Sequence, residues 1–385
     1  MLLSTTLLAS LLVAVSAKKG LLAAYYPASQ VDAAIDWNVT DIGYYMAAVT
    51  AKNGLAFPAG KPGLADFVLR AHAHKKKAVL SIGGPEGSQY FSSLVRTETA
   101  RAKFVEQILE VGRKYNTDGV DISWQFPTVH GNPKNEIDPK DSANLLKLLK
   151  DLRRSRPKEW LSAAVSPNGI FAPSGTTTLS NYQDFAEVVD AFNVMAYHYV
   201  GAWNEWTGPD SPSHQCGTGR SVTTDIERFI KAGFVANKIM LGIPSFGKAF
   251  TLHNNTLRTS VVYGDQQVPK KYQIRIRQRY ETYNGADNTF VKLKAQGILK
   301  GEDGLTAGRG YKRHYDHCSR TPFLFNPGTK SFITYLDARS ASYRAQIAVQ
   351  QEYLGVFVSS IGLDNLAFNA IDKALKTPID GFATD

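Results

Sequence analysis

The sequence contains few cysteines and few long apolar runs, and each shortage limits what the protein can be. Only two of its 385 residues are cysteine, Cys216 and Cys318, so at most one disulfide can form within the chain. After residue 17 no apolar stretch reaches the roughly 20 residues that a membrane-spanning helix requires. Internal repeats and low-complexity tracts do not stand out either. We therefore expect a soluble protein without a membrane span.

Several ligand-binding patterns are missing as well. The histidines and carboxylates show no metal-ligand spacing, so we expect no metal and no cofactor. The chain carries 44 basic and 34 acidic residues, which gives a net charge of +10. Such a charge favours anionic cell-wall polymers or membrane surfaces in a general way. Because there is no basic helix and no interleaved aromatic platform, nucleic acid is not an expected partner.

The N-terminus has the features of an export signal. Residues 1–17 form a short apolar run that ends in small residues, with Val15 and Ala17 at the −3 and −1 positions of a cleavage site. This pattern predicts a secretory signal peptide. A membrane anchor is the alternative, but the run is too short to cross a bilayer. We expect a secreted, extracellular protein.

Secretion bears on the cysteines and on two glycosylation sequons. Cys216 and Cys318 are expected to form one disulfide that closes a loop of about 100 residues. Two buried free thiols are the alternative. Asn38 in N-V-T and Asn254 in N-N-T are candidate sites of N-glycosylation. We expect a disulfide-bonded, monomeric glycoprotein.

Short apolar runs alternate with amphipathic or charged stretches along the chain. Continuous apolar strands that alternate with helices indicate a parallel sheet covered by helices. Eight strands in a chain of this length predict a closed (β/α)8 barrel, also called a TIM barrel. An open, doubly wound sheet is the alternative, but A-Y-Y-P-A-S follows the first strand where that fold wants a glycine-rich phosphate turn. The expected strands are Gly20–Tyr26, Ile42–Val49, Ala78–Ile82, Gly119–Trp124, Leu161–Val165, Ala191–Tyr197, Ile239–Ile243 and Gly355–Ser359.

One segment interrupts this alternation. Between the seventh and eighth strands, residues 250–320 show little helical periodicity and are expected to form a small α+β insertion domain. The barrel would then comprise residues 18–249 and 321–385. Within the insertion, Arg275, Arg277 and Arg279 would share one face of a strand. A solvated face is favoured there over an anion-binding stripe.

In a (β/α)8 barrel the functional site forms at the carboxyl ends of the strands. The fourth strand directs Asp121, Ser123 and Gln125 toward the barrel interior, because side chains alternate along a strand. A single carboxylate could do acid–base work there only if His198, at the end of the sixth strand, supplied the second proton-transfer group. The alternative, favoured by these residues alone, is that Asp121 is a buried, hydrogen-bonded aspartate of the core.

Four motifs follow one another at the strand ends. They are S-I-G-G from Ser81, D-G-V-D-I-S-W-Q from Asp118, M-A-Y-H from Met195 and G-I-P-S-F-G from Gly242. These motifs resemble those of glycoside hydrolase family 18, the chitinases and chitinase-like proteins. The stretch Y-D-H-C-S-R-T-P-F-L-F-N-P-G-T-K-S-F-I-T-Y-L-D is similar to secreted fungal members. The resemblance covers nearly the whole mature chain and implies the (β/α)8 barrel with an insertion after strand seven.

The resemblance also implies which residues would carry catalysis. In the family, a glutamic acid closes D-x-x-D-x-D-x-E and protonates the leaving oxygen, while the preceding aspartate holds the sugar acetamide that attacks the anomeric carbon. Here that motif reads Asp118, Asp121, Ser123, Gln125, and His198 replaces the aspartate of the family's M-x-Y-D. The Gln125 amide has no titratable proton and the Ser123 hydroxyl is neutral. We therefore predict a catalytically inactive member.

Sugar binding is a separate question, because aromatic residues of the family are also replaced. Family tryptophans correspond to Ser29, Pro85 and Ser359, an aromatic to Ala47 and a tyrosine to Phe246. Trp203 and Trp206, in the loop after strand six, either contact sugar or pack beneath the insertion. The other candidates for contacting sugar are Tyr25, Gly83, Gly84, Trp124, Met195, Tyr197 and Ser359.

Two hypotheses about function follow. The first is a protein that binds chitin or N-acetylglucosamine oligomers without hydrolysing them. The second is an inhibitor or effector that has lost sugar binding and contacts another protein. A weak residual chitinase is the least favoured interpretation, since both neutral replacements would have to be bypassed.

Overall fold

The computed structural model describes residues 20–28, 35–57, 63–216, 219–257, 278–360 and 362–377. The expected signal peptide, Ser29, Arg275 and Arg277 lie outside these ranges. In the described part of the chain, eight parallel strands close into a barrel in the order β1-β16-β8-β7-β6-β5-β4-β2, and β1 also pairs with β2. The strands are β1 Leu21–Pro27, β2 Ile42–Ala51, β4 Lys77–Gly83, β5 Gly119–Ser123, β6 Trp160–Val165, β7 Ala191–Val194, β8 Ile239–Pro244 and β16 Gly355–Ser359.

The (β/α)8 prediction is confirmed, because each of the eight expected segments forms one barrel strand. Strand β7 is the one whose length differs clearly, since it stops at Val194 and the prediction extended it to Tyr197. The backbone explains the early end. The N–H groups of Ala196 and Tyr197 donate to the carbonyls two residues before them, at 2.7 Å each, so the chain turns out of the ladder. A short strand, β3 Gly54–Ala56, pairs antiparallel with β2.

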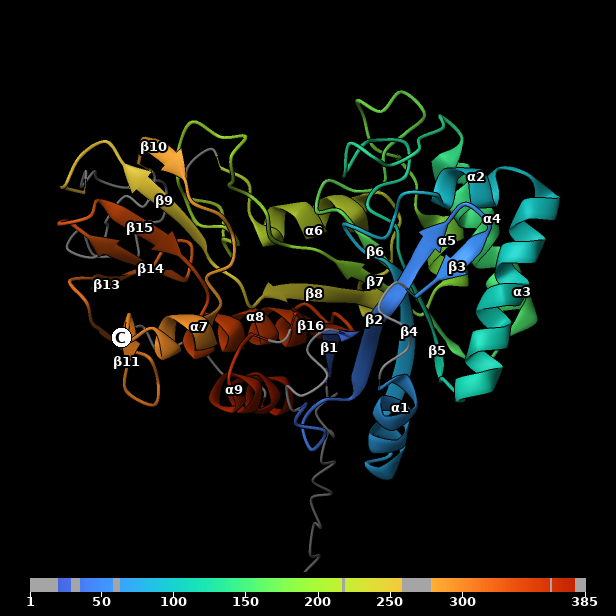
Figure 1. The fold of residues 1–385 in the computed structure, drawn as a ribbon, viewed down its shortest axis with the longest axis horizontal. Helices are drawn as coiled ribbons and strands as arrows, with labels where there is room; N and C mark the ends of the chain where they lie inside the picture. Colours follow the sequence, from blue (N-terminus) through green and yellow to red (C-terminus); the bar gives the residue numbers. More distant parts are fainter. Residues whose placement is uncertain are drawn as a thin grey trace, which may run out of the picture.

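Helices cover the outside of the barrel, and local sequence signals set their ends (Figure 1). Helix α3 is an example, because the Thr97 hydroxyl caps its first turn by accepting from Ala100 N–H at 3.2 Å. Asn116 ends it in a left-handed conformation. The helices are α1 Leu64–Ala73, α2 Phe91–Arg96, α3 Glu98–Tyr115, α4 Asp141–Ser155, α5 Gln183–Val188, α6 Val222–Lys231, α7 Phe290–Ala295, α8 Ala338–Gln350 and α9 Asn365–Lys376.

A second, antiparallel sheet lies beside the barrel, at the left of Figure 1. Its order is β10-β9-β15-β14-β13, and together with α7 and a β11–β12 hairpin it forms the α+β insertion. The sheet extends past residue 320, where the insertion was expected to end, because the last two strands pair with β13 and β9. Its strands are β9 Lys248–Leu252, β10 Tyr280–Tyr283, β13 Lys312–Asp316, β14 Thr321–Asn326 and β15 Ser331–Thr334; the hairpin is β11 Leu299–Lys300 and β12 Thr306–Ala307.

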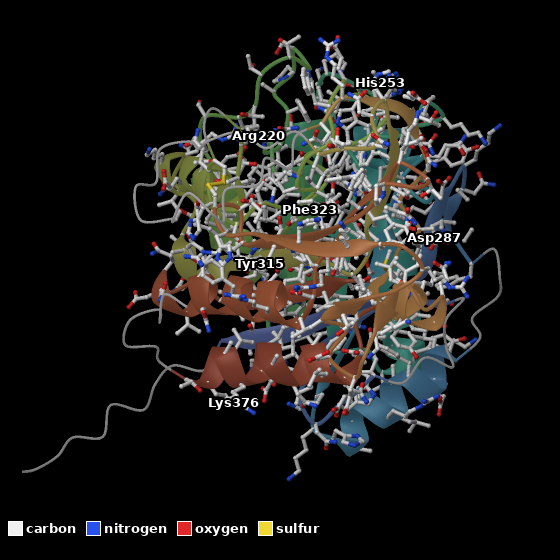
Figure 2. All side chains as sticks on the ribbon, turned by 90° about the vertical axis from the view of Figure 1, so that its left-hand side faces the viewer. Arg220, His253, Asp287, Tyr315, Phe323 and Lys376 are labelled. Atoms are coloured by element: carbon white, nitrogen blue, oxygen red, sulfur yellow. A yellow bond between two sulfur atoms is a disulfide. The ribbon has the colours of Figure 1, made fainter. Side chains whose placement is uncertain are left out.

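The two cysteines form the predicted disulfide. Cys216 in the loop after β7 and Cys318 after β13 are bonded, with Cα atoms 5.9 Å apart and a sequence separation of 102. Figure 2 shows this bond on the side of the molecule that carries the insertion. The disulfide therefore ties the β7–α6 loop to the second sheet.

Candidate functional site

Residues of neighbouring strands meet at the rim where the parallel strands end. In register, Asp121 of β5 lies between Ser81 of β4 and Ser162 of β6, and Ser123 lies beside Gly83. Because side chains alternate along β5, Asp121 and Ser123 point to the same side, the barrel interior, with Asp121 one level deeper. This register positions the candidate site.

Asp121 is a fully buried carboxylate held by four donors. Tyr25 Oη and Ser81 Oγ donate to one of its oxygens at 3.0 and 2.7 Å. Ser162 Oγ and Asn193 Nδ2 donate to the other at 2.8 and 3.2 Å. Burial raises the pKa of Asp121, while the four hydrogen bonds favour the charged form and oppose that rise. These contacts match the expectation of a buried, hydrogen-bonded core aspartate.

The two neutral motif residues at the end of β5 touch each other. The Gln125 amide Nε2 donates to Ser123 Oγ at 3.3 Å. The Gln125 backbone is held as well, since its N–H donates to Ser88 Oγ at 3.0 Å and its carbonyl accepts from Asn135 Nδ2 at 2.7 Å. Neither the amide nor the hydroxyl titrates near neutral pH. This pair can therefore donate and accept hydrogen bonds but cannot deliver a proton as an acid.

An aromatic cluster occupies the rim between β7 and β8. The His198 ring stacks on Phe246 with centroids 5.0 Å apart, and the Tyr197 ring meets Phe246 edge-on at 5.5 Å. His198 retains solvent contact, but the protein packed around it removes part of its hydration. That desolvation and the nearby charge of Lys248 lower the pKa of His198, so its imidazole is neutral at neutral pH. None of the four donors to Asp121 is His198, so the structure does not assemble these two residues into an acid–base pair.

Two motif residues lie away from the rim. Asp118 precedes β5, at the opposite end of the barrel, where His72 Nε2 lies 2.9 Å from its carboxylate and the Ala78 N–H donates to it at 2.7 Å. Trp124 was expected to contact sugar, but it is 1 % exposed and stacks on Phe91 of α2 with centroids 4.9 Å apart. The reason is strand alternation, which points Trp124 outward when Ser123 points inward.

The remaining predicted sugar contacts are mostly covered. Tyr25, Met195 and Tyr197 are 4 %, 6 % and 4 % exposed. Gly83 and Gly84 adopt φ angles of 107° and 84°, and a Cβ on Gly83 would meet the Ser123 carbonyl oxygen at 2.5 Å. Gly83 is thus needed for the close approach of β4 to β5, and Gly84 for its positive φ. The Gly84 N–H completes the approach by donating to the same carbonyl at 2.8 Å.

Ser359 remains at the rim. It ends β16 and is partly exposed, and its carbonyl oxygen accepts from the Ser245 N–H at 3.0 Å. Of the predicted sugar contacts, Ser359 is therefore one that can still face a ligand.

Sequence reasoning missed a buried ion pair near this rim. Lys248 Nζ lies 2.7 Å from Asp210 Oδ1, and the two side chains are 1 % and 4 % exposed. Burial raises the pKa of Asp210 to about 6, against the lowering effect of Lys248. Above Lys248, at 4.9 Å, lies the ring of Trp203, which is 66 % exposed. The tryptophan was a candidate, but nothing in the sequence indicated that a buried cation supports it.

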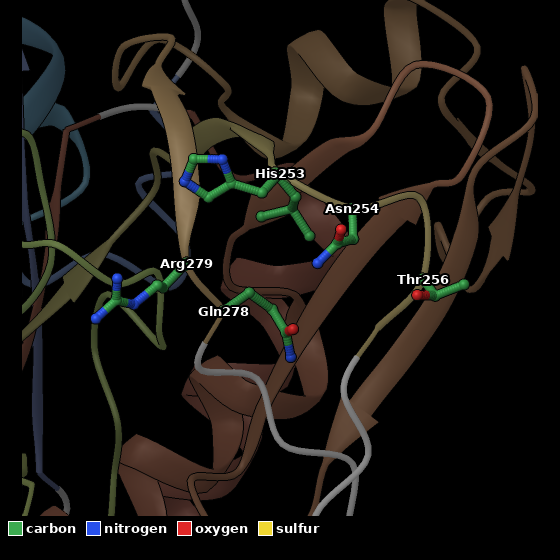
Figure 3. Close-up of a pocket in the computed structure, with 6 residues that line it drawn as sticks. His253, Asn254, Thr256, Gln278 and Arg279 are labelled. Carbon is green, nitrogen blue, oxygen red and sulfur yellow. The ribbon is translucent and has the colours of Figure 1, made fainter.

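A small pocket lies elsewhere, on the insertion (Figure 3). It has a volume of about 200 Å³ and is formed by the end of β9, the residues that follow it and the residues that precede β10. Asn254 of the second sequon is part of it, and both sequon asparagines, Asn38 and Asn254, are exposed. We assign no chemistry to this pocket. Its lining residues are Leu252, His253, Asn254, Thr256, Gln278 and Arg279.

The described residues contain neither a metal-binding cluster nor a membrane-spanning helix. No group of three or more histidine, cysteine, aspartate or glutamate side chains there is arranged to hold a metal ion. Within the same ranges, none of the helices is both long and apolar enough to span a membrane.

A (β/α)8 barrel whose polar strand ends carry a D-x-x-D-x-S-x-Q motif has the architecture of a glycoside hydrolase with altered acid positions. The model of the family "Glycosyl hydrolases family 18" matches residues 23–364. The chain therefore belongs to glycoside hydrolase family 18.

Relatives and solved structures agree with this assignment. A chitinase-like effector of Moniliophthora roreri is 31 % identical over 370 residues, which cover 88 % of this chain and 86 % of the relative. A second chitinase-like effector, from Moniliophthora perniciosa, is 27 % identical over 321 residues and covers 78 % and 72 %. The crystal structure of a Rhizomucor miehei chitinase superposes with a TM-score of 0.79 at 26 % identity, covering 92 % of this chain and 99 % of that one.

Proposed function

We propose that this protein is a secreted, catalytically inactive member of family 18 that binds chitin or N-acetylglucosamine oligomers without hydrolysing them. The observation that carries the inactivity is the contact between Gln125 and Ser123, two neutral side chains at the positions of the family's acid and acetamide-holding residues. Hydrolysis needs a proton for the leaving oxygen and a group that holds the acetamide. An amide and a hydroxyl replace both.

No other described group at the rim takes over these roles. Asp121 is completely buried and each of its oxygens already accepts two hydrogen bonds, so it is not available to a glycosidic oxygen. His198 is neutral at neutral pH and stacks on Phe246. The chemistry left to the site is recognition through hydrogen bonds and aromatic faces.

The proposal that the protein still binds sugar rests on the exposed ring of Trp203. A Cβ on Gly201 would lie 2.5 Å from that ring, so the indole covers the glycine closely while 66 % of the side chain stays exposed. The Lys248 ammonium supports the ring from the protein side at 4.9 Å. Such a fixed aromatic face suits the apolar face of a pyranose ring. The name of the Moniliophthora roreri relative, a chitinase-like effector, is in keeping with a chitinase-like protein.

Export is part of the proposal. The apolar segment of residues 1–17, the Cys216–Cys318 disulfide and the exposed sequon residues Asn38 and Asn254 all fit an oxidising, extracellular location. The size of the chain and its single barrel are compatible with a monomer.

Two assays with purified protein test the proposal. Retention on chitin beads that N-acetylglucosamine oligomers compete away is the expected result, together with no detectable release of a chromogenic aglycone from a chitobioside. Complete flow-through would reject sugar binding and favour a protein partner. Aglycone release at the rate of ordinary chitinases would reject inactivity.

A further inference from the structure

Two arginine side chains on the insertion side of the molecule contact tyrosine rings and form no direct ion pair with a described residue, although the charge of Arg320 acts on the buried carboxylate of Asp316. The Arg339 guanidinium lies 4.4 Å from the ring centroid of Tyr315, and that of Arg320 lies 5.1 Å from the ring of Tyr343. An ion pair requires a carboxylate oxygen within 4.0 Å of the cation. Among the described residues, no carboxylate oxygen lies that close to either guanidinium. Figure 2 shows Tyr315 on the face that also carries the disulfide.

The geometry brings these two charges together. Arg339 and Tyr343 are four residues apart on α8, so they occupy the same face of that helix. Because Arg320 lies over Tyr343, its guanidinium is a neighbour of Arg339 across about one helical turn. The pKa of His317 also indicates that both arginines lie close to one another. After burial, the charges of both Arg339 and Arg320 lower the pKa of His317.

The start of α8 brings no uncompensated negative charge to the two arginines. Arg339 occupies the first turn of this helix, where the positive end of the helix dipole lies, and that turn contains no acidic residue. The carboxylates nearby are engaged elsewhere. Asp337 caps the helix by accepting from Ser340 N–H at 2.9 Å and pairs with Arg313. Asp316 accepts from the backbone N–H and the hydroxyl of Ser319.

We propose that Arg320 and Arg339 form a binding site for an oxyanion group of an acidic polysaccharide, a carboxylate or a sulfate. Contact with a tyrosine ring restricts the position of each guanidinium, and its N–H groups can donate in the forked geometry that oxyanions accept. An oxyanion between the two guanidiniums would also relieve the repulsion of like charges one helical turn apart. This site is separate from the barrel rim and does not depend on chitin binding.

The surroundings favour a polysaccharide over other anionic partners. None of the exposed large hydrophobic side chains of the described residues belongs to residues 311–321 or 338–343, so the cluster has no apolar group to insert into a membrane or to form the core of a protein interface. One face of each of Tyr315 and Tyr343 is covered by an arginine, which leaves less ring surface to stack on nucleic-acid bases. A hydrated, regularly charged polymer requires neither feature.

Titration with oligogalacturonate and with a sulfated heparin oligosaccharide at low and at physiological salt tests the site. We expect wild-type protein to bind at least one of them, with weaker binding at higher salt. The double variant Arg320→Gln/Arg339→Gln should lose about tenfold or more in affinity, which is the effect of losing one charge-assisted hydrogen bond. The control Lys103→Gln/Lys147→Gln removes the same charge from exposed residues of α3 and α4 and should bind like wild type.

Several outcomes of the same experiment would contradict the proposed oxyanion site. Equal binding by wild type and the arginine variant, or no binding by wild type at low salt, would overturn the site. Polyglutamate or inorganic sulfate binding as tightly as the saccharides would overturn the assignment to a polysaccharide. The exposed single variant Arg339→Gln replaces the double variant if the latter does not fold. Chitin-bead retention, measured in parallel, should be unchanged by the arginine substitutions, so failure of either proposal is seen separately.

Discussion

The side-chain amide of Gln125 donates a hydrogen bond to the hydroxyl of Ser123 at the carboxyl end of β5. Since both residues are neutral, acids at these two positions should supply the proton donor and the acetamide-holding group that the proposed inactive site lacks. We expect Ser123→Asp/Gln125→Glu to release aglycone from a fluorogenic chitobioside at a rate about 100-fold or more above wild type, the usual contribution of a general acid. The rate should stay below that of chitinases, because His198 and Ser359 also depart from the family pattern.

A matched control distinguishes this effect from that of added charge. Gln296→Glu introduces the same carboxyl at an exposed position after α7 and should leave the rate unchanged. Equal rates for wild type and the double variant would mean that the β5 positions do not account for the proposed inactivity.

Asp121 is expected to act as a structural residue. Its four donors all need an acceptor, and Asp121→Asn replaces one accepting oxygen by an NH₂ group that faces hydroxyl and amide donors. The free energy of unfolding in urea should fall by about 2–4 kcal/mol. Asp66→Asn on the surface of α1, which breaks an exposed pair with Arg70, should cost no more than about 1 kcal/mol. A loss for Asp121→Asn as small as that of the surface variant would contradict the role.

The Lys248–Asp210 pair predicts a pH-dependent stability. In the folded protein the pKa of Asp210 is raised from 3.8 to about 6, so the folded state binds more protons than the unfolded state between these values. The contribution of Asp210 to stability therefore falls as the pH rises through that window. Lys248→Met removes the cation that opposes this shift and leaves the buried carboxylate uncompensated.

We expect Lys248→Met to lose about 3–5 kcal/mol of unfolding free energy at pH 8, with a loss that shrinks as the pH approaches 4. Urea melts at several pH values measure this. The exposed Lys103→Met serves as the control and should show a small, pH-independent change. A loss for Lys248→Met that is the same at pH 4 and pH 8 would mean that packing, and not the charge of Asp210, is responsible.

Trp203 should contribute to chitin binding without contributing to stability. Because its ring is 66 % exposed, Trp203→Ala is expected to leave the melting temperature within about 2 °C of wild type while weakening binding to N-acetylglucosamine oligomers about 3- to 10-fold. Leu69→Ala, on α1 and 68 % exposed, is the matched control and should bind like wild type. Unchanged titrations for Trp203→Ala would remove this ring from the sugar site.

The disulfide should be a major source of stability. Cys216 and Cys318 are 102 residues apart, and closing a loop of that length stabilises the folded state by about 4–5 kcal/mol in the chain-entropy model. Cys216→Ser/Cys318→Ser should therefore lower the urea midpoint, and adding a reductant to wild type should have the same effect. Ser342→Ala, a substitution on the nearby α8, controls for local disturbance and should leave the midpoint unchanged within error.

The barrel could be predicted from the sequence because its strands are buried on both faces and appear as continuous apolar runs. The end of β7 could not, since Ala196 and Tyr197 are as apolar as the strand before them and only their local hydrogen bonds show the turn. The end of the second sheet also lies beyond residue 320, where the sequence predicted the insertion to end. Strand β14 joins the second sheet through a hairpin with β13. Strand β15 joins it by pairing with β9, a contact between segments far apart in the chain that no local pattern contains.

The positions of side chains were likewise predictable from the sequence in some cases and not in others. Alternation along β5 correctly predicted that Asp121 and Ser123 share one side, and the same rule places Trp124 on the other. Family resemblance nevertheless suggested Trp124 as a sugar contact. The Lys248–Asp210 pair joins residues 38 positions apart, counted from 210 to 248, and had no signal in the sequence.

The amino-acid sequence by itself determined that the end of β5 carries an amide and a hydroxyl, because the loss of a titratable group is a matter of residue identity alone. Only the tertiary structure decided what becomes of the remaining carboxylate. Asp121 accepts hydrogen bonds from Tyr25, Ser81, Ser162 and Asn193, which come from β1, β4, β6 and β7. These donors are far apart in the chain and meet only when the barrel closes, and a buried carboxylate without them would not be tolerated.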